Sequence, residues 1–212
     1  MSENKYSKGF RFKLADIGKF SGHSDSVVNQ LSPGCRIMGI TRGDFSLIDL
    51  IYSILRKIGK SDIVVCTWSA GIKDANQVKW MLEEDLMNSF TIITDRSYST
   101  RQKKYSVELT KLFGEENIRV SDIHAKFTLI SNKDWKIVIR HSMNLNANRT
   151  CESFEIDDSN EIYEFYYSFI KHHFDNAENG FQPKRWKTSV VVDSFFTEND
   201  LFEEVDFSFT EE

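Results

Sequence analysis

The stretch that decides the fold covers residues 123–156 and reads IHAKFTLISNKDWKIVIRHSMNLNANRTCESFEI. It holds two apolar, β-rich runs, residues 126–131 and 135–141, with a short polar segment between them. Two strand-like runs joined by so short a polar segment predict an antiparallel hairpin. After a polar loop, a further strand is expected at residues 152–156.

Polar side chains mark the strand ends of this stretch. His124 and Lys126 lie two residues apart at the start of the first strand, and residues i and i+2 of a strand point to the same face. Ser142 and Asn144 repeat that spacing at the end of the returning strand, and Glu152 begins the next one. We therefore expect an imidazole, an ammonium, a hydroxyl, an amide and a carboxylate to converge where the strands end.

Each of these groups has a use in the cleavage of a phosphodiester. The neutral imidazole of His124 can attack phosphorus and form a covalent phosphohistidine. Lys126, Asn144 and Ser142 can stabilise the non-bridging oxygens as charge develops on them, and Glu152 can hold one imidazole nitrogen. A second, protonated histidine would donate a proton to the leaving oxygen. This set of groups requires no divalent metal and no cofactor.

At these residues the sequence resembles the phospholipase D superfamily, whose signature is HxK, then an Asp, then GSxN. The matching positions are His124 and Lys126, then Ser142 and Asn144, and then Glu152. The sequence is most similar to the short bacterial and phage nucleases of that superfamily, which carry one motif per chain and act as dimers. The resemblance implies a homodimer in which His124 is the nucleophile in one subunit and the general acid in the other.

Two positions depart from that signature. Ser131 stands where the pattern places Asp, a residue that mostly supports structure in the family, and His141 stands where the pattern has Gly. The His141 side chain would either obstruct the substrate or supply another donor. We include it with Ser142, Lys126 and Asn144 in the expected phosphate-binding set. The departures leave open an alternative, a degenerate relative that binds nucleic acid or a protein partner without cleavage.

Apolar segments before the hairpin alternate between the periods of strands and helices. Strands are expected at residues 36–41, 62–67 and 90–94, and helices at 45–58, 74–86, 100–113 and, after the last strand, 160–174. This alternation predicts an α/β protein with a mixed, mostly parallel sheet and helices on both faces. We expect a phospholipase-D-like domain at residues 35–175, an irregular N-terminal arm at 1–34 and a C-terminal extension at 176–212.

The net charge of −5 hides an asymmetry along the chain. Eight of the 32 acidic residues and no Lys or Arg fall in residues 193–212, so the other 24 acidic and all 27 basic residues give the remainder a net charge of +3. A mildly basic body suits a partner that carries phosphates. Arg101, Lys103 and Lys104 form a basic cluster near a helix start, which is placed to contact a nucleic-acid backbone. Trp68, at a strand end, is placed to line the site.

The acidic tail mixes phenylalanine with carboxylates, a composition typical of surface interaction segments. It would either dock on a protein partner or cover the basic cleft as a nucleic-acid mimic. No apolar run approaches the roughly 20 residues that cross a bilayer, and an odd number of cysteines without a CxxC pair favours reduced thiols in a cytoplasmic protein. No amphipathic membrane-binding segment stands out, and the short single-motif relatives that the sequence resembles are mostly nucleases. Nucleic acid is therefore the preferred substrate, and a membrane lipid is a third alternative.

Overall fold

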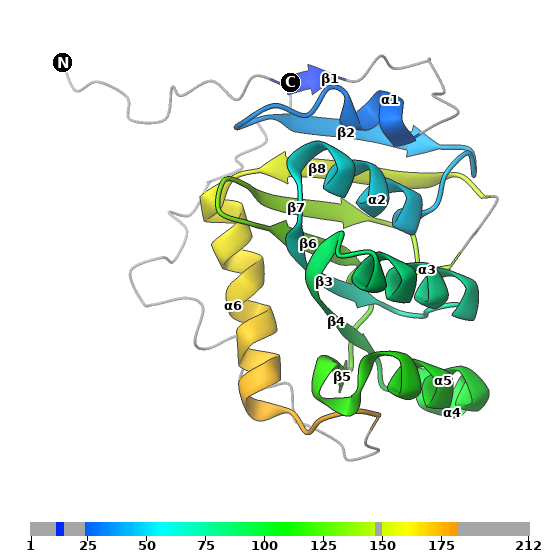
Figure 1. Ribbon diagram of the computed structural model, residues 1–212. Coiled ribbons are helices and arrows are strands. Elements are labelled where there is room, and N and C mark those ends of the chain that lie inside the picture. Colours follow the sequence, from blue (N-terminus) through cyan, green and yellow to red (C-terminus); the bar gives the residue numbers. More distant parts are fainter. Residues whose placement is uncertain (1–11, 15–23, 147–149, 182–212) are drawn as a thin grey trace, which may run out of the picture.

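The computed structural model describes residues 12–14, 24–146 and 150–181 (Figure 1). The strands of this part of the chain form one sheet in the order β1-β2-β8-β7-β6-β3-β4-β5. Their bounds are β1 Phe12–Leu14, β2 Arg36–Thr41, β3 Ser61–Thr67, β4 Met87–Asp95, β5 Ile118–Ser121, β6 Phe127–Ser131, β7 Lys136–His141 and β8 Glu152–Asp158. The predicted hairpin is confirmed as β6 and β7, and the predicted strand after it as β8.

The sheet is mixed, as predicted, but parallel pairings are not its majority. β1 pairs with β2, β3 with β4, and β4 with β5 in parallel. The pairings β2–β8, β8–β7, β7–β6 and β6–β3 are antiparallel. The reason is that the hairpin and β8 enter the middle of the sheet, between β2 and β3. The short loop between β6 and β7 makes these two strands antiparallel, and the outer strands of the insertion also pair antiparallel, β8 with β2 and β6 with β3.

Helices cover both faces of the sheet (Figure 1). Their bounds are α1 Ser24–Val28, α2 Leu47–Ile58, α3 Ile72–Glu83, α4 Tyr98–Arg101, α5 Lys103–Phe113 and α6 Asn160–Asn176, with a 3₁₀ turn at Glu115–Asn117. The main core lies between one face and α2, α3 and α5. A smaller core on the opposite face packs Phe127, Leu129 and Val138 against Tyr163 and Ile170 of α6. None of the described helices is long and apolar enough to cross a membrane.

Two segments differ from the sequence prediction. Residues 24–34, which we had placed in the irregular arm, include α1, and Val27, Val28 and Leu31 are buried in the main core. These residues therefore belong to the folded body. The expected helix at 100–113 is two helices, because Gln102 leaves the helical region with φ −129° and ψ 48° between α4 and α5.

Local chemistry explains where the elements begin and how closely they pack. Ser46 and Asp49 form a capping box that starts α2, each side chain bonding the other residue's backbone N–H. Ser159 starts α6 by accepting a hydrogen bond from Ile162 N at 3.3 Å. On β2, a Cβ at Gly39 would lie 2.4 Å from the ring of Phe154, so glycine leaves the room that this core ring needs against the strand.

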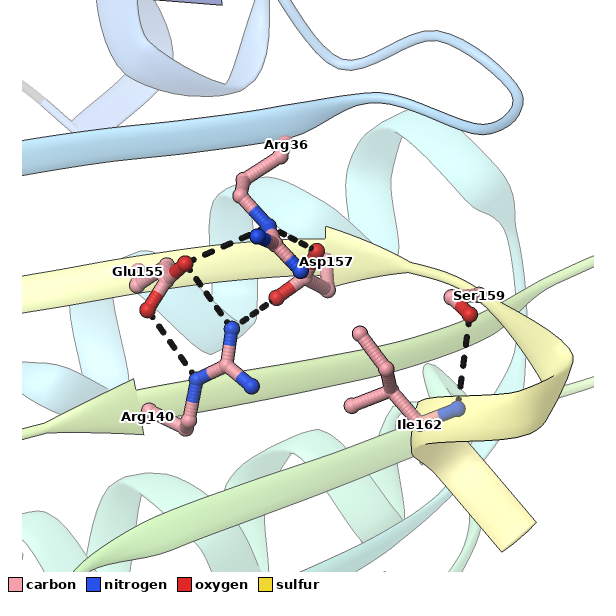
Figure 2. A network of polar contacts seen from close by, with 6 residues as sticks. All are labelled: Arg36, Arg140, Glu155, Asp157, Ser159 and Ile162. Carbon is pink, nitrogen blue, oxygen red and sulfur yellow. Dashed lines mark hydrogen bonds and ion pairs between the residues drawn. The ribbon is translucent and has the colours of Figure 1, made fainter. Parts of the chain in front are cut away.

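Four charged residues form an ion network on β2, β7 and β8 (Figure 2). Arg36 contacts Asp157 at 2.5 Å and Glu155 at 3.2 Å. Arg140 contacts Glu155 at 2.9 Å and also bonds Asp157. The Asp157 side chain is only 5% exposed. Each charge in this β2–β7–β8 ion network is thus offset by two opposite charges, as a largely desolvated cluster requires.

Candidate active site at one end of the sheet

Strand register brings four chain segments to one end of the sheet. Phe127, the first residue of β6, pairs with Cys66 near the end of β3 and with Arg140 near the end of β7. His141, the last residue of β7, pairs with Phe154 near the start of β8. β3 and β7 therefore end where β6 and β8 begin, and we call this place the site end of the sheet. It is where the sequence predicted the polar groups to converge.

His124 and Lys126 lie in the loop that enters β6, just before the strand that we expected to contain Lys126. His124 is exposed and Lys126 is half-buried. Lys126 Nζ donates to the His124 carbonyl at 3.4 Å, and the Lys126 carbonyl accepts from His141 N at 3.2 Å. Cys66 Sγ donates to the Ala125 carbonyl at 3.6 Å. The loop is thus anchored to β3 and β7 while the imidazole stays at the surface.

Asn144 is held close to the end of β3. Leu145 N donates to the Ser69 carbonyl at 3.1 Å, and Gly71 N donates to the Leu145 carbonyl at 2.7 Å. These bonds join the loops that follow β3 and β7. They place Asn144 Oδ1 3.5 Å from Thr67 Oγ1. An amide thus lies beside the end of β3, the strand that pairs with β6.

Ser142 and Glu152 lie next to each other across the ends of β7 and β8. The Ser142 hydroxyl donates to the Glu152 carboxylate and accepts from Ser153 N at 2.9 Å. Thr150 Oγ1 donates to Glu152 Oε1 at 3.2 Å. Glu152 is therefore at the site end of the sheet, as predicted. Its role in orienting His124 stays a prediction.

His141 does not face the site end of the sheet. Its side chain is buried, and its ring bonds Thr128 Oγ1 at 3.1 Å and the Met143 carbonyl at 3.0 Å. Since a carbonyl only accepts, Nδ1 carries the proton and Nε2 accepts from the threonine hydroxyl. Burial lowers the His141 pKa to about 4. This arrangement does not support the phosphate contact that we expected, because both ring nitrogens are already used.

Ser131, at the position of the signature Asp, lies at the other end of β6. The Tyr163 hydroxyl donates to Ser131 Oγ at 2.8 Å, a buried bond between the sheet and α6. Burial raises the Tyr163 pKa, and the bond to Ser131 acts against that rise. The position therefore joins strand to helix, far from His124 along the strand.

The predicted basic cluster lies on α4 and α5, and one of its members reaches the site. The Arg101 guanidinium carbon is 3.7 Å from the centroid of the Trp68 ring. The Trp68 ring in turn meets the His124 ring edge-on, with 6.2 Å between centroids. Lys103 and Lys104 are exposed at the start of α5. Arg101 thus extends the site end of the sheet through Trp68, which directly follows β3.

The described residues contain no group of three His, Cys, Asp or Glu side chains suited to holding a metal ion. What they bring together is one exposed imidazole, one ammonium, one amide and a serine–glutamate pair. Such a set can form a covalent bond to phosphorus and stabilise negative charge on its oxygens.

No family model matches the sequence, and no curated protein does. Solved structures do match. NucT from Helicobacter pylori is 14% identical, with a TM-score of 0.50 over 68% of this chain and 99% of that one. Nuc from Salmonella typhimurium, described as a phospholipase D family member, is 13% identical, with a TM-score of 0.49 over 68% of this chain and 96% of that one. The likeness to NucT concerns the fold, and this chain has the phospholipase-D-like fold that its motif predicted.

Proposed function

We propose that this chain is a metal-independent phosphodiesterase that cleaves nucleic acid through a phosphohistidine on His124. The observation that carries the proposal is the gathering of His124, Lys126 and Asn144 at the site end of the sheet. A phospholipase-D-like fold supports a phosphodiesterase in general terms. The finer assignments rest on the chemistry of these side chains.

The reaction has two displacements. In the first, a nitrogen of the His124 imidazole attacks phosphorus, and the bond from phosphorus to the leaving oxygen breaks as that oxygen takes a proton from an acid. In the second, water attacks phosphorus, loses a proton to the group that acted as acid, and the nitrogen–phosphorus bond breaks. Lys126 and Asn144 would stabilise the non-bridging oxygens in both steps.

The need for a second histidine, which donates a proton to the leaving oxygen, is the reason to expect a homodimer. Of the histidines in the described part of the chain, His124 alone is exposed, because His141 and His173 are buried and His172 is half-buried on α6. The resemblance to single-motif nucleases implies that a second imidazole facing the same phosphate would come from a second copy of the chain. A two-fold pairing of site ends would bring one His124 to each side of the phosphate.

Nucleic acid is the substrate that the charges favour. Arg101, Lys103 and Lys104 lie on the helices next to the site end, and residues 1–192 carry a net charge of +3. Cations beside a phosphodiester site bind the neighbouring phosphates of a polymer, which supplies affinity without sequence specificity.

The test is cleavage of labelled single- and double-stranded DNA and RNA in EDTA by the wild type and His124→Ala. Cleavage should survive EDTA and fall by at least about 10³-fold in the variant, because the nucleophile is lost. His172→Ala is the matched control, since it removes a histidine outside the site. Equal activity of the wild type and His124→Ala would reject the mechanism.

Mixing subunits tests the shared site. With a ninefold excess of His124→Ala, random pairing leaves about one wild-type subunit in ten with a wild-type partner, so activity per wild-type subunit should fall about tenfold. Activity that does not change on mixing would place a complete site in one chain.

One observation favours the alternative of a binding protein without cleavage. The Ser142 hydroxyl already donates to Glu152, so a serine that should bind phosphate has its proton in use within the chain. A binder of this kind should hold nucleic acid in a 1:1 complex with the site, and it should leave every substrate uncut.

A further inference from the structure

Trp68 and Arg101 form a stacked pair beside His124. The guanidinium carbon of Arg101 lies 3.7 Å from the Trp68 ring centroid, and its Nη2 donates to the Trp68 carbonyl at 3.4 Å. Trp68 meets His124 edge-on with centroids 6.2 Å apart. An aromatic ring thus adjoins the group that would attack phosphorus, and a cation lies on that ring.

A chain of hydrogen bonds through Ser97 to Asp95 fixes the guanidinium of Arg101. Its Nε donates to Ser97 Oγ at 2.9 Å. Ser97 N donates to Asp95 Oδ1 at 2.9 Å, and the Ser97 hydroxyl bonds the same carboxylate. Asp95 is the last residue of β4 and is buried. A side chain fixed in this way from a strand end has a defined orientation toward the site, unlike the exposed lysines that follow it on α5.

Arg101 still has donors to offer. A guanidinium carries five N–H groups, and within the described residues two of them are used, by Ser97 and by the Trp68 carbonyl. The remaining three suit a phosphate, which arginine binds with two parallel hydrogen bonds.

We propose that Trp68 and Arg101 form a nucleotide subsite that selects single-stranded nucleic acid. Arg101 covers one face of the Trp68 ring, so the base beside the scissile phosphate would stack on the other face, and Arg101 would bind the next phosphate along the strand. The proposal deepens the proposed function and rests on it for the position of the scissile phosphate. It also assigns a role to the pair that the cleavage chemistry does not require.

Base pairing is the reason for the selection. In a single strand an unpaired base can leave its neighbours and stack on an aromatic ring, which strengthens binding roughly tenfold per base. In a duplex the same base must first be unpaired and unstacked. The Trp68 and His124 ring centroids are 6.2 Å apart. Stacking on Trp68 would therefore favour the binding of single strands with a phosphate beside His124.

Binding is measured on full-length His124→Gln, which keeps a flat polar group beside Trp68 but cannot carry the reaction. Labelled 12-nucleotide single-stranded DNA, its RNA counterpart and the matching DNA duplex are titrated at one salt concentration. The single strands should bind at least roughly tenfold more tightly than the duplex. Adding Trp68→Leu should weaken single-strand binding roughly tenfold and duplex binding less than about twofold.

Three further variants separate stacking from folding. Trp68→Phe should restore most of the single-strand affinity, because a ring remains. Arg101→Gln should weaken single-strand binding and reduce the salt slope by about one ion. Trp80→Leu, at an exposed tryptophan packed on Tyr52 of α2, should change nothing. If Trp68→Leu weakens the binding of single strands and duplex equally, or changes the binding of neither, the proposed subsite is rejected.

The outcomes also separate the subsite from the cleavage proposal. The wild type could cleave no substrate while single-strand preference still depends on Trp68. That result would support the proposed subsite and reject the proposed enzymatic activity. His124-dependent cleavage that ignores Trp68→Leu would keep the enzyme and reject the subsite.

Discussion

Two polar clusters lie in the same sheet, one on β2, β7 and β8 and one at the ends of β3, β6, β7 and β8, and they differ in what they bond. In the β2–β7–β8 ion network, Arg36 and Arg140 each contact both Glu155 and Asp157. At the site end of the sheet, Ser142 and Glu152 bond each other, but the two groups that would act on phosphorus, His124 and Lys126, make few contacts within the described residues. Within the described residues, Lys126 Nζ bonds only a backbone carbonyl, at 3.4 Å, and the His124 ring has only its edge contact with Trp68.

This difference in bonding distinguishes polar groups that stabilise the fold from polar groups that are available to bind a ligand. Charges taken out of water must be paired, and the network meets that need within the chain. An exposed imidazole and a half-buried ammonium with spare donors gain their best partners only when an anion binds. The network should therefore control stability and the site end should control activity.

Among the variants that compare the two clusters, Lys126→Ala should have the largest effect, and that effect is on activity. Removing a cation that stabilises the transition state should lower kcat/KM by about 10²–10³-fold. The free energy of unfolding should change by no more than about 0.5 kcal/mol, because the ammonium makes one long bond. Lys133→Ala, at the exposed turn of the same hairpin, is the control and should leave both quantities unchanged. A loss of stability without a loss of activity would place Lys126 among the structural charges.

The next effect is on stability, from Asp157→Ala. It removes a buried carboxylate that both arginines contact, and breaking a desolvated ion cluster costs roughly 3 kcal/mol in the free energy of unfolding. Urea unfolding measures the loss. Asp134→Ala, an exposed carboxylate in the hairpin turn, should cost less than about 0.5 kcal/mol. If cleavage below the unfolding transition falls with Asp157→Ala as it does with Lys126→Ala, the division between the two clusters fails.

The sequence pattern located the hairpin and its polar ends, because two apolar, β-rich runs flank a short polar segment. It missed β5, Ile118–Ser121, since a strand of four residues that includes Arg119 shows no clear period. The buried Arg119 bonds the carbonyls of Glu116 and Ile118 and lies 4.3 Å from the Phe174 ring centroid. Only the folded chain supplies those partners.

The buried position of the His141 side chain could have been predicted from the sequence. His141 follows Ile137 and Ile139 at a spacing of two, so it shares their face of β7, which faces the main core. The pairing of Trp68 with Arg101 was not available. The two residues are 33 positions apart, and only the packing of α4 beside the end of β3 brings them together.

Acid should destabilise the protein through His141, a buried histidine directly beside the site. Its pKa is lowered to about 4 in the folded chain, against about 6.5 unfolded. The unfolded chain therefore binds more protons, and the contribution of His141, complete above pH 6.5, is lost as pH falls toward 4. Between pH 7 and pH 5 the loss should be about 2 kcal/mol.

Urea unfolding at both pH values, compared between wild type and His141→Gln, measures that loss. The variant should start less stable at pH 7 and lose about 2 kcal/mol less on acidification. Burial also lowers the pKa of His173, so His173→Gln should shift the profile in the same direction. An identical acid loss in the wild type and His141→Gln would mean that His141 is not held neutral by the core.

The smallest expected effect concerns the acidic tail, residues 193–212, which lie outside the described residues. The tail carries eight carboxylates and no Lys or Arg. This negative charge should repel a nucleic acid bound at the site or compete with it. Truncation after residue 192 should therefore raise single-strand affinity roughly threefold at low salt and steepen its salt dependence. A full-length variant with the eight acids changed to Asn or Gln separates charge from length, and it should match the truncation. Unchanged affinity in both would reject the nucleic-acid mimic and leave a protein partner as the proposal for the tail.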